Sequence, residues 1–400
     1  MQNMSIFAAV MTGKGTGAIA TIQIFGDSAK TVIKKVFKPA GNKPLKFKTG
    51  EIHIGSITDD AEVIDQVTIG CEGPDIFGIN CHGNPLIVEM IMQLLRRHGA
   101  ALLTAEQLLK KLLTAQKTAD IIAVEAKLVQ AKARTLQGTK IIANQIGAGL
   151  AKKAGVWLES IDEISLDTIK AEAIEILQKS QVAKLIIYGC TAVLTGPPNS
   201  GKSTLLNRLA GRQKAIVTDI KGTTRDWVEA TCRIDPLSLT LIDTAGLDEE
   251  SAGPESTVEN AAQKKTAEIL EQTDIVLLVL DASQSIEELD DQITNRLNDK
   301  KVITVLNKSD LPAKFDTSRL PAELSNTVQI SAKEGAGIEQ LIEKIRRTSG
   351  VAEFDAQQSV CFTSRQENLL KKLKNAKSKQ QAASIIKELL KGHVRGGLSF

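Results

Sequence analysis

The chain has 400 residues and a mass of 43.0 kDa, which predicts roughly two to four domains rather than one. Hydrophobic residues make up 42% of the sequence and charged residues 24%, a balance that excludes a mainly disordered chain. No apolar run approaches the ~18 residues that a membrane-spanning helix needs. The formal net charge of +3 is compatible with a nucleic-acid partner but does not indicate one.

The five cysteines are scattered along the chain and include no CxxC pair. An odd number without framework spacing argues against disulfide bonds and against a structural zinc site. The N-terminus has no basic region and only a short apolar run, so a secretory signal is not expected. These features predict a cytoplasmic protein with reduced thiols and no membrane contact.

Residues 1–100 alternate short apolar runs with turn signals and predict an N-terminal α+β domain. Residues 18–25 (AIATIQIF) alternate with period two, which predicts a strand. Residues 87–97 (IVEMIMQLLRR) repeat apolar side chains at three- and four-residue spacing, which predicts an amphipathic helix.

Residues 101–184 differ in composition from the segment before them, because alanine, leucine, lysine and glutamine dominate and proline is absent. Apolar spacing over residues 102–113 and 119–136 predicts helices, so this segment is expected to form the first part of a helical domain. Residues 350–400 again have the composition of helices. They predict the second part of the helical domain, which looks shortened.

Residues 185–349 alternate strand-like and helical runs, with strands predicted at 191–195, 237–242, 275–280 and 302–306. Apolar strands that alternate with helices predict a mainly parallel sheet covered on both faces. The simplest arrangement is an α/β domain inserted in an all-α helical domain.

The segment GPPNSGKS, at residues 196–203, matches the phosphate-binding pattern GxxxxGKS/T. It follows a predicted strand and opens a predicted helix, where backbone N–H groups can surround phosphate groups. Lys202 is expected to reach the β and γ phosphates, and the Ser203 hydroxyl to bind Mg²⁺. The predicted contacts with the nucleotide come from Asn199, Ser200, Gly201, Lys202, Ser203 and Thr204.

Three further motifs follow predicted strands and would complete a site for GTP. Asp243 of DTAG (243–246) is placed to hold Mg²⁺ through water, and SAK (331–333) would close over the base. Asp310 of NKSD (307–310) can accept two hydrogen bonds from guanine that adenine cannot supply. The predicted residues of these motifs are Asp243, Thr244, Ala245, Gly246, Asn307, Lys308, Asp310, Ser331, Ala332 and Lys333.

Hydrolysis needs a group that positions water, and Leu247, the residue after DTAG, cannot do so. Hydrolysis is therefore weak or depends on another group. Arg225 lies in the segment GTTRD (222–226) and is either catalytic or a solvated surface charge. A site for ATP instead of GTP remains open only if Asp310 lies outside the base pocket.

The segments GPPNSGKSTLLN, AIVTDIKGTTRD, DTAGL, NKSD and SAK together closely resemble the tRNA-modification GTPase family MnmE, also called TrmE. The resemblance implies a P-loop GTPase (G) domain inserted in an all-α helical domain, preceded by an α+β N-terminal domain similar to the family's folate-binding domain. It also implies GTP hydrolysis, modification of C5 of the tRNA wobble uridine, a flavin-containing partner protein and a homodimer. An Era-like ribosome-assembly GTPase is an alternative, but such proteins lack the split helical domain.

The GTPase of this family is activated by potassium, so the resemblance implies a K⁺ site beside the phosphates. The ion would place positive charge against the phosphate oxygens, as an arginine finger does. The matching residues are Asn199, Thr218, Ile220 and Thr223 for K⁺ and Ser203 and Thr224 for Mg²⁺, with Thr218, Thr223 and Thr224 also expected to contact the nucleotide. Glu259, in Val258-Glu259, matches the family's water-orienting glutamate and is, with Lys202, the expected catalytic group.

The family's folate-binding Arg, Glu and Lys fall on Gln23, Gly78 and Thr118, with Lys117 beside the last. Without the Arg and the Glu, the charged pairing that a folate needs is missing, so a tetrahydrofolate cofactor is doubtful. The family's Cys-x-Gly-Lys tail is also absent, since the sequence ends GGLSF. Two hypotheses remain: a GTPase that takes part in tRNA modification, or a divergent GTPase switch that has lost folate binding and tRNA modification.

Two other features are open to a functional reading. Cys81 and His82 are adjacent, but neighbouring residues of a strand point to opposite faces, so a structural role is expected for them. The lysines between residues 371 and 379 either contact tRNA phosphates or form a solvated helix face.

Overall fold

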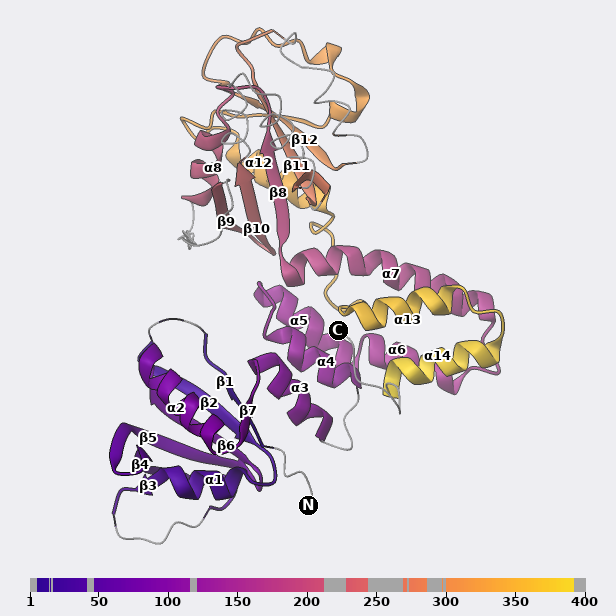
Figure 1. The fold of residues 1–400 in the computed structure, drawn as a ribbon. Coiled ribbons are helices and arrows are strands. Elements are labelled where there is room, and N and C mark those ends of the chain that lie inside the picture. The colour runs from indigo at the N-terminus through magenta and orange to yellow at the C-terminus, as the bar shows by residue number, and fades with distance from the viewer. Residues whose placement is uncertain are drawn as a thin grey trace, which may run out of the picture. The chain divides into compact units, whose positions relative to one another are not determined.

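The computed structural model describes residues 6–13, 15, 17–41, 47–115, 121–211, 228–243, 269–271, 273–285, 297 and 300–391. The chain divides into two compact units, Met1–Asp120 and Ile121–Phe400 (Figure 1). No helix in these residues combines the length and the apolar character needed to cross a bilayer. The five cysteines are all buried and unpaired.

The first unit is a seven-stranded sheet in the order β3-β4-β5-β6-β2-β1-β7. Neighbouring strands are antiparallel except β1 and β7, which are parallel. Its elements are β1 (Ile6–Val10), β2 (Ile19–Phe25), α1 (Ala29–Val36), β3 (Phe37–Pro39), β4 (Ile52–Asp59), β5 (Glu62–Gly73), β6 (Ile76–His82), α2 (Pro85–Arg97), β7 (Ala100–Leu102) and α3 (Ala105–Ala115).

The predicted strand and helix of this unit are confirmed as β2 and α2, and both form for local reasons. The alternation of β2 buries Ala20, Ile22 and Ile24 in the core. Helix α2 begins after Asn84, whose side chain accepts a hydrogen bond from the Leu86 N–H at 2.9 Å. The core of the unit is formed by one face of the sheet with the apolar sides of α1 and α2.

Helix α3 belongs to the first unit, whereas the sequence placed its residues in the helical domain. Leu108 and Leu112 of α3 are buried against Ala9 of β1. The unit therefore ends at Asp120 instead of near residue 100. The helix predicted over these residues is confirmed, but an apolar stripe does not reveal which surface covers it.

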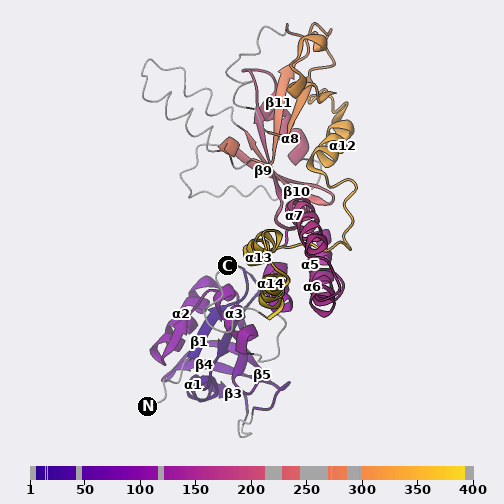
Figure 2. The ribbon, with the colours of Figure 1, turned by 90° about the vertical axis from the view of Figure 1, so that its right-hand side faces the viewer.

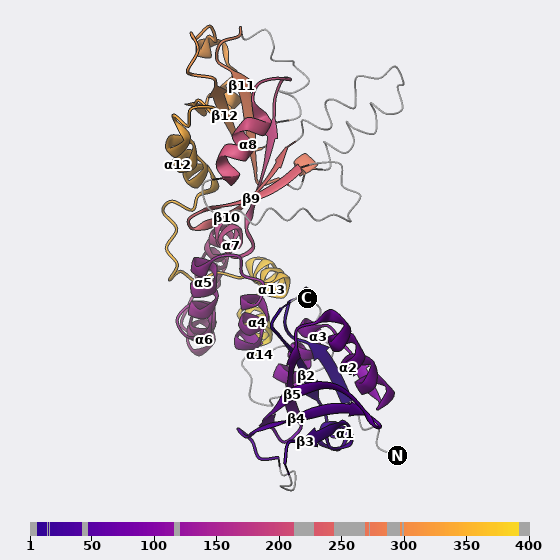
Figure 3. The same cartoon turned by 90° about the vertical axis from the view of Figure 1, so that its left-hand side faces the viewer.

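The second unit contains helices and a six-stranded sheet in the order β13-β12-β11-β8-β10-β9. The sheet is parallel except for β9, which pairs antiparallel with β10. Helix α8 contacts β8, β9 and β10, and α12 contacts β11, β12 and β13 (Figure 3). The elements are α4 (Ile121–Gln130), α5 (Leu136–Gly147), α6 (Leu150–Glu159), α7 (Leu166–Tyr188), β8 (Cys190–Thr195), α8 (Lys202–Ala210), β9 (Val228–Ile234), β10 (Leu237–Asp243), β11 (Ile275–Asp281), β12 (Val302–Asn307), β13 (Thr327–Gln329), α12 (Ile338–Ser349), α13 (Ser364–Lys374) and α14 (Lys379–Lys391).

The four strands predicted for this unit are confirmed as β8, β10, β11 and β12. The helix expected over residues 119–136 is wrong at its end, because α4 stops at Gln130 and a new helix starts at Leu136. The Thr135 hydroxyl accepts a hydrogen bond from the Gly138 N–H at 2.9 Å and so begins α5.

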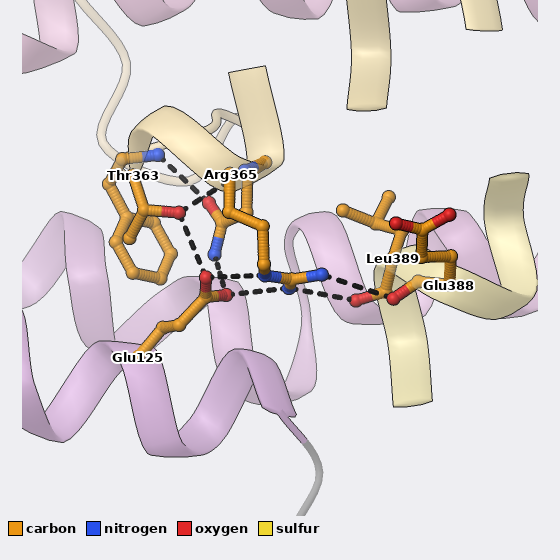
Figure 4. A network of polar contacts seen from close by, with 7 residues as sticks. Glu125, Thr363, Arg365, Glu388 and Leu389 are labelled. Carbon is orange, nitrogen blue, oxygen red and sulfur yellow. Dashed lines mark hydrogen bonds and ion pairs between the residues drawn. The ribbon is translucent and has the colours of Figure 1, made fainter. Parts of the chain in front are cut away.

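Helices from before and after the sheet pack against each other. Helix α13 contacts α7, and α14 contacts α6 and α4 (Figures 1 and 2). Between them lies the carboxylate of Glu125, which is fully buried and is bound by Thr363, Arg365 and Gln366 of the C-terminal segment (Figure 4). The same guanidinium donates to the backbone oxygens of Glu388 and Leu389, near the end of α14.

Candidate functional site

The loop between β8 and α8 needs glycine at both glycine positions of its motif. Gly196 has a φ of +140°, and a Cβ there would lie 2.1 Å from the Val279 oxygen. Gly201 has a φ of +95°, and a Cβ there would lie 2.2 Å from the Asn307 amide nitrogen. Asn199 also adopts a left-handed conformation, with a φ of 61°. The loop therefore lies against the backbone of β11 at Gly196 and against the side chain of Asn307, from β12, at Gly201.

The lysine of the motif is folded into this loop. Lys202 is buried, and its Nζ donates to the Gly196 oxygen at 2.7 Å and to the Pro197 oxygen at 3.1 Å. Ser200 is buried as well, and its hydroxyl has no hydrogen-bond partner among the described residues. The first residues of α8 add backbone N–H groups, with Thr204 exposed on the first turn. A cationic side chain, an unpartnered hydroxyl and a helix N-terminus together suit a phosphate group.

Two predicted Mg²⁺ residues meet across this site. The Ser203 hydroxyl at the start of α8 donates to Oδ2 of Asp243 at 2.7 Å. Asp243 is the last residue of β10, which runs parallel to β8, so both loops leave the same edge of the sheet. A hydroxyl and a carboxylate are hard oxygen donors, which fits Mg²⁺.

Asn307, at the end of β12, connects the phosphate loop with the SAK loop. Its Nδ2 donates to the Ser200 oxygen at 2.8 Å, and its Oδ1 accepts from the Ala332 N–H at 2.9 Å. The amide is buried, and both its ends are used. The motifs GKS, NKSD and SAK therefore form one continuous site.

Asp310 lies exposed at the rim of this site. A hydrogen bond from Ser331 is the main cause that holds the pKa of the Asp310 carboxyl below its usual value. Lys333, also exposed, contributes a favourable positive charge. An ionised carboxylate accepts hydrogen bonds only, which suits the two donors on the edge of guanine.

Asp281 and Arg208 support this site, and the sequence analysis missed both. Lys308 has a φ of 64° and its Nζ lies 2.6 Å from Oδ2 of Asp281. Burial raises the pKa of Asp281, but hydrogen bonds from Lys308 and Ser283 outweigh it and lower that pKa overall. Asp281 is the last residue of a parallel strand, and the same position in its strand was the reason to predict Asp243 as a site residue. No comparable pattern in the sequence indicates Arg208.

Several predicted site residues lie outside the described residues, so the contacts expected of them stay predictions. They are Thr118, Thr218, Ile220, Thr223, Thr224, Thr244, Ala245, Gly246 and Glu259. Among the described residues, no group of three or more His, Cys, Asp and Glu side chains is arranged to hold a metal ion.

The first unit places two of the substituted folate positions opposite each other. Gln23 of β2 pairs in register with Gly78 of β6. Nε2 of Gln23 donates to Glu72 of β5 at 2.6 Å, and the other carboxylate oxygen of Glu72 lies 2.9 Å from the position of a Cβ at residue 78. A carboxylate from the neighbouring strand therefore occupies the space over Gly78.

Cys81 and His82 do not act on each other in the structure. The imidazole Nδ1 of His82 lies 2.7 Å from Asp65, which also accepts the His82 backbone N–H at 2.8 Å. Burial, followed by the negative charge of Asp65, raises the pKa of the Cys81 thiol to about 11. A protonated, buried thiol beside an imidazole that faces elsewhere supports the structural role expected for this pair.

Comparison with known families gives two matches. Residues 191–308 match the family described as 50S ribosome-binding GTPase, and residues 6–107 match the family described as GTP-binding protein TrmE N-terminus.

Curated relatives with the name tRNA modification GTPase MnmE align with most of the chain. The protein of Thermotoga maritima (strain ATCC 43589) is 32% identical over 407 residues, which cover 93% of this chain and 88% of the relative. The protein of Clostridioides difficile (strain 630) is 30% identical over 373 residues, which cover 84% and 80%. Among solved structures, the G domain of the T. maritima FeoB iron transporter is 29% identical, with a TM-score of 0.32, and covers 40% of this chain and 98% of that one.

Proposed function

Because this chain belongs to the MnmE family of tRNA modification GTPases, we propose that the site around Lys202 binds GTP with Mg²⁺ and hydrolyses it with the help of K⁺ during tRNA modification. GTP hydrolysis is the activity of this family, and the chain is a GTPase. The observation that carries the assignment of residues is the 2.7 Å contact between Ser203 and Asp243 beside the buried Lys202.

Each described residue has a defined task in this proposal. Lys202 would neutralise charge on the β and γ phosphates, while Ser203 and Asp243 would hold Mg²⁺, which would supply further positive charge there. Asn307 fixes the distance between the phosphate loop and the base side. Asp310 accepts hydrogen bonds from guanine and so excludes adenine.

The proposed potassium site and catalytic glutamate rest on the sequence resemblance. Asn199 is the described member of the proposed K⁺ set, and its left-handed backbone is compatible with a role of its side chain at the rim of the phosphate loop. Thr218, Ile220 and Thr223 complete the proposed K⁺ set, and Thr224 the Mg²⁺ set. Glu259 would orient the attacking water, a task that Leu247 cannot perform.

Replacing Glu259 with glutamine is expected to slow hydrolysis at least ~100-fold, because the amide cannot take a proton from water. GTP affinity should stay within about threefold, since the proposed contact is made only during the reaction. Phosphate release and nucleotide affinity, measured in KCl and in NaCl, test both points. The matched control is Glu323→Gln, an exposed glutamate of the same α/β part.

Two results would speak against these assignments. Equal loss of binding and hydrolysis in the Glu259 variant would mean that this glutamate is not the water-orienting group. Hydrolysis by the unaltered chain at the same rate in KCl and NaCl would remove the potassium site from the proposal.

We also propose that the G domain, residues 185–349, is inserted in a helical domain whose two parts lie before and after it. The packing of α13 on α7 and of α14 on α4 and α6 supports this arrangement. Taking α3 into the N-terminal domain moves the first boundary of the helical domain to about residue 120. A homodimer formed through the N-terminal domain, binding of tRNA and a flavin-containing partner protein are proposed from the family alone.

A second candidate function is a GTP switch that has lost folate binding and tRNA modification. It is motivated by Gln23 and Gly78, which replace two charged residues of the family. The contact of Gln23 with Glu72 leaves a carboxylate at this place but no positive charge. The family function requires that a folate binds without the arginine.

Complementation of cells that lack the family enzyme separates the two candidates. We expect expression of this chain with the flavin-containing partner to restore the modified wobble uridine, measured by mass spectrometry of tRNA nucleosides. The Lys202→Ala variant should not restore it, because it cannot use GTP. If the unaltered chain restores nothing while the purified protein hydrolyses GTP, the second candidate is correct.

A further inference from the structure

Arg208 connects α8, the helix that follows the phosphate loop, with the SAK loop (331–333), which is predicted to lie over the base. It lies on α8, the helix that begins with Lys202 and Ser203, and is half-buried. Its Nε donates to the Ala332 oxygen at 2.9 Å, and its guanidinium also donates to the Lys333 oxygen. The planar guanidinium therefore donates hydrogen bonds to two consecutive carbonyl groups of the SAK loop.

The SAK loop, which Arg208 holds, lies beside the Asp310 carboxylate that is proposed to bind guanine. The Ala332 N–H is fixed by Asn307, so Arg208 and Asn307 hold the two polar groups of that residue's backbone. The loop closes on itself through the Ser331 oxygen, which accepts the Gly335 N–H at 2.7 Å. The Ser309 N–H, next to Asp310, donates to the Ile330 oxygen at 3.0 Å, and a hydrogen bond from Ser331 is the main cause of the lowered pKa of Asp310. A chain of contacts thus leads from α8 to Asp310.

We infer that Arg208 is a positioning residue for guanine: it holds the SAK loop, so that Ser331 keeps the Asp310 carboxylate turned towards the base. The inference rests on the proposed GTP site. Asp310 is exposed and has no buried packing to fix its rotamer, so a mobile loop would let the carboxylate turn away. The contacts described for Arg208 are with the Ala332 and Lys333 oxygens and not with Ser203 or Asp243, so its loss should leave the reaction step itself intact.

The test is the affinity of Arg208→Ala for GTP and for inosine triphosphate, which lacks the exocyclic amine of guanine. The Kd for GTP is expected to rise about tenfold, the size of a lost charge-assisted hydrogen bond. The Kd for inosine triphosphate should rise less, because one of its two contacts with Asp310 is already missing. The Kd for inosine triphosphate divided by the Kd for GTP therefore falls. The kcat at saturating GTP should stay within about twofold of that of the unaltered protein.

Two further variants make the result specific. Arg208→Lys should recover part of the ratio, since an ammonium group can donate to one of the two carbonyls. Arg233→Ala, an exposed arginine on β9 of the same sheet, should behave like the unaltered protein.

The outcomes are distinguishable. An unchanged ratio for Arg208→Ala overturns the inference, whether both affinities stay the same or fall together. A kcat that falls as far as the affinity also overturns it, because Arg208 would then act on the reaction or on the fold as a whole. An unaltered protein that binds neither nucleotide would instead overturn the proposed function, and the inference with it.

Discussion

Replacing Lys202 with alanine is expected to reduce GTP hydrolysis at least ~100-fold and to weaken GTP binding, because the buried ammonium group is the only cation inside the described phosphate loop. Its hydrogen bonds to the Gly196 and Pro197 oxygens hold it at the centre of the loop. A positive charge held in advance needs no reorganisation when charge develops on the phosphates.

The expected result is checked by phosphate release at saturating GTP and by binding of a fluorescent guanine nucleotide. Lys314→Ala is the matched control, since Lys314 is exposed in the same part of the chain. The two carbonyls freed by the mutation can be solvated, so the circular dichroism of the variant should match that of the unaltered protein. Hydrolysis within about threefold of the unaltered chain would contradict the central role given to this lysine.

Much of the nucleotide site could be predicted from the sequence because its chemistry is local. Gly196 is required by a close backbone oxygen and Gly201 by the close Asn307 side chain, and the strand before them and the helix after them are both continuous in sequence. Asp243 and Asn307 each end a strand of the parallel sheet. Parallel strands bring their carboxyl ends to one edge of the sheet. Predicting the strands from the sequence therefore also predicts which residues meet in the site.

The remaining contacts could not be predicted because they join distant segments without a local signal. Glu72 reaches Gln23 across the intervening strand β6, and Arg208 reaches a loop that lies more than a hundred positions further on. Which surface covers an amphipathic helix is equally undetermined, which is why the sequence predicts a helix over the residues of α3 but not its packing against β1. Glu125 looks like a surface residue in an amphipathic run, although its partner Arg365 is 240 positions away.

The buried carboxylate of Glu125 leads to the largest expected effect on stability. Its side chain is fully buried and accepts from Thr363 at 3.0 Å, from Gln366 at 2.7 Å, and from Nε and Nη2 of Arg365 at 2.7 and 2.8 Å (Figure 4). Four donors satisfy a charge that would otherwise be very costly away from water. Removing the carboxylate leaves the guanidinium, which is 13% exposed, with its two backbone partners among the described residues and no counter-charge from Glu125.

Glu125→Ala is therefore expected to lower the free energy of unfolding of the helical part by about 3–5 kcal/mol. Unfolding in urea can be followed by the fluorescence of Trp157, which is fully buried in α6, in a Trp227→Phe background. The matched control is Glu175→Ala, whose carboxylate pairs with Lys179 at 2.5 Å on the exposed side of α7. That exposed pair should contribute less than about 1 kcal/mol. A Glu125 variant no less stable than the Glu175 variant would show that the buried carboxylate does not stabilise the helical part.

A double mutant separates the pairing from the packing. Replacing Glu125 with leucine and Arg365 with methionine removes both charges and keeps most of the volume, so the double variant should be more stable than either single variant. Because Glu125 lies on α4, before the sheet, and Arg365 lies on α13, after it, this ion pair holds together helices from both sides of the GTPase segment. Hydrolysis by the double variant at the rate of the unaltered chain would show that the pair serves the architecture, whereas slower hydrolysis with restored stability would show that GTP turnover depends on the charges themselves.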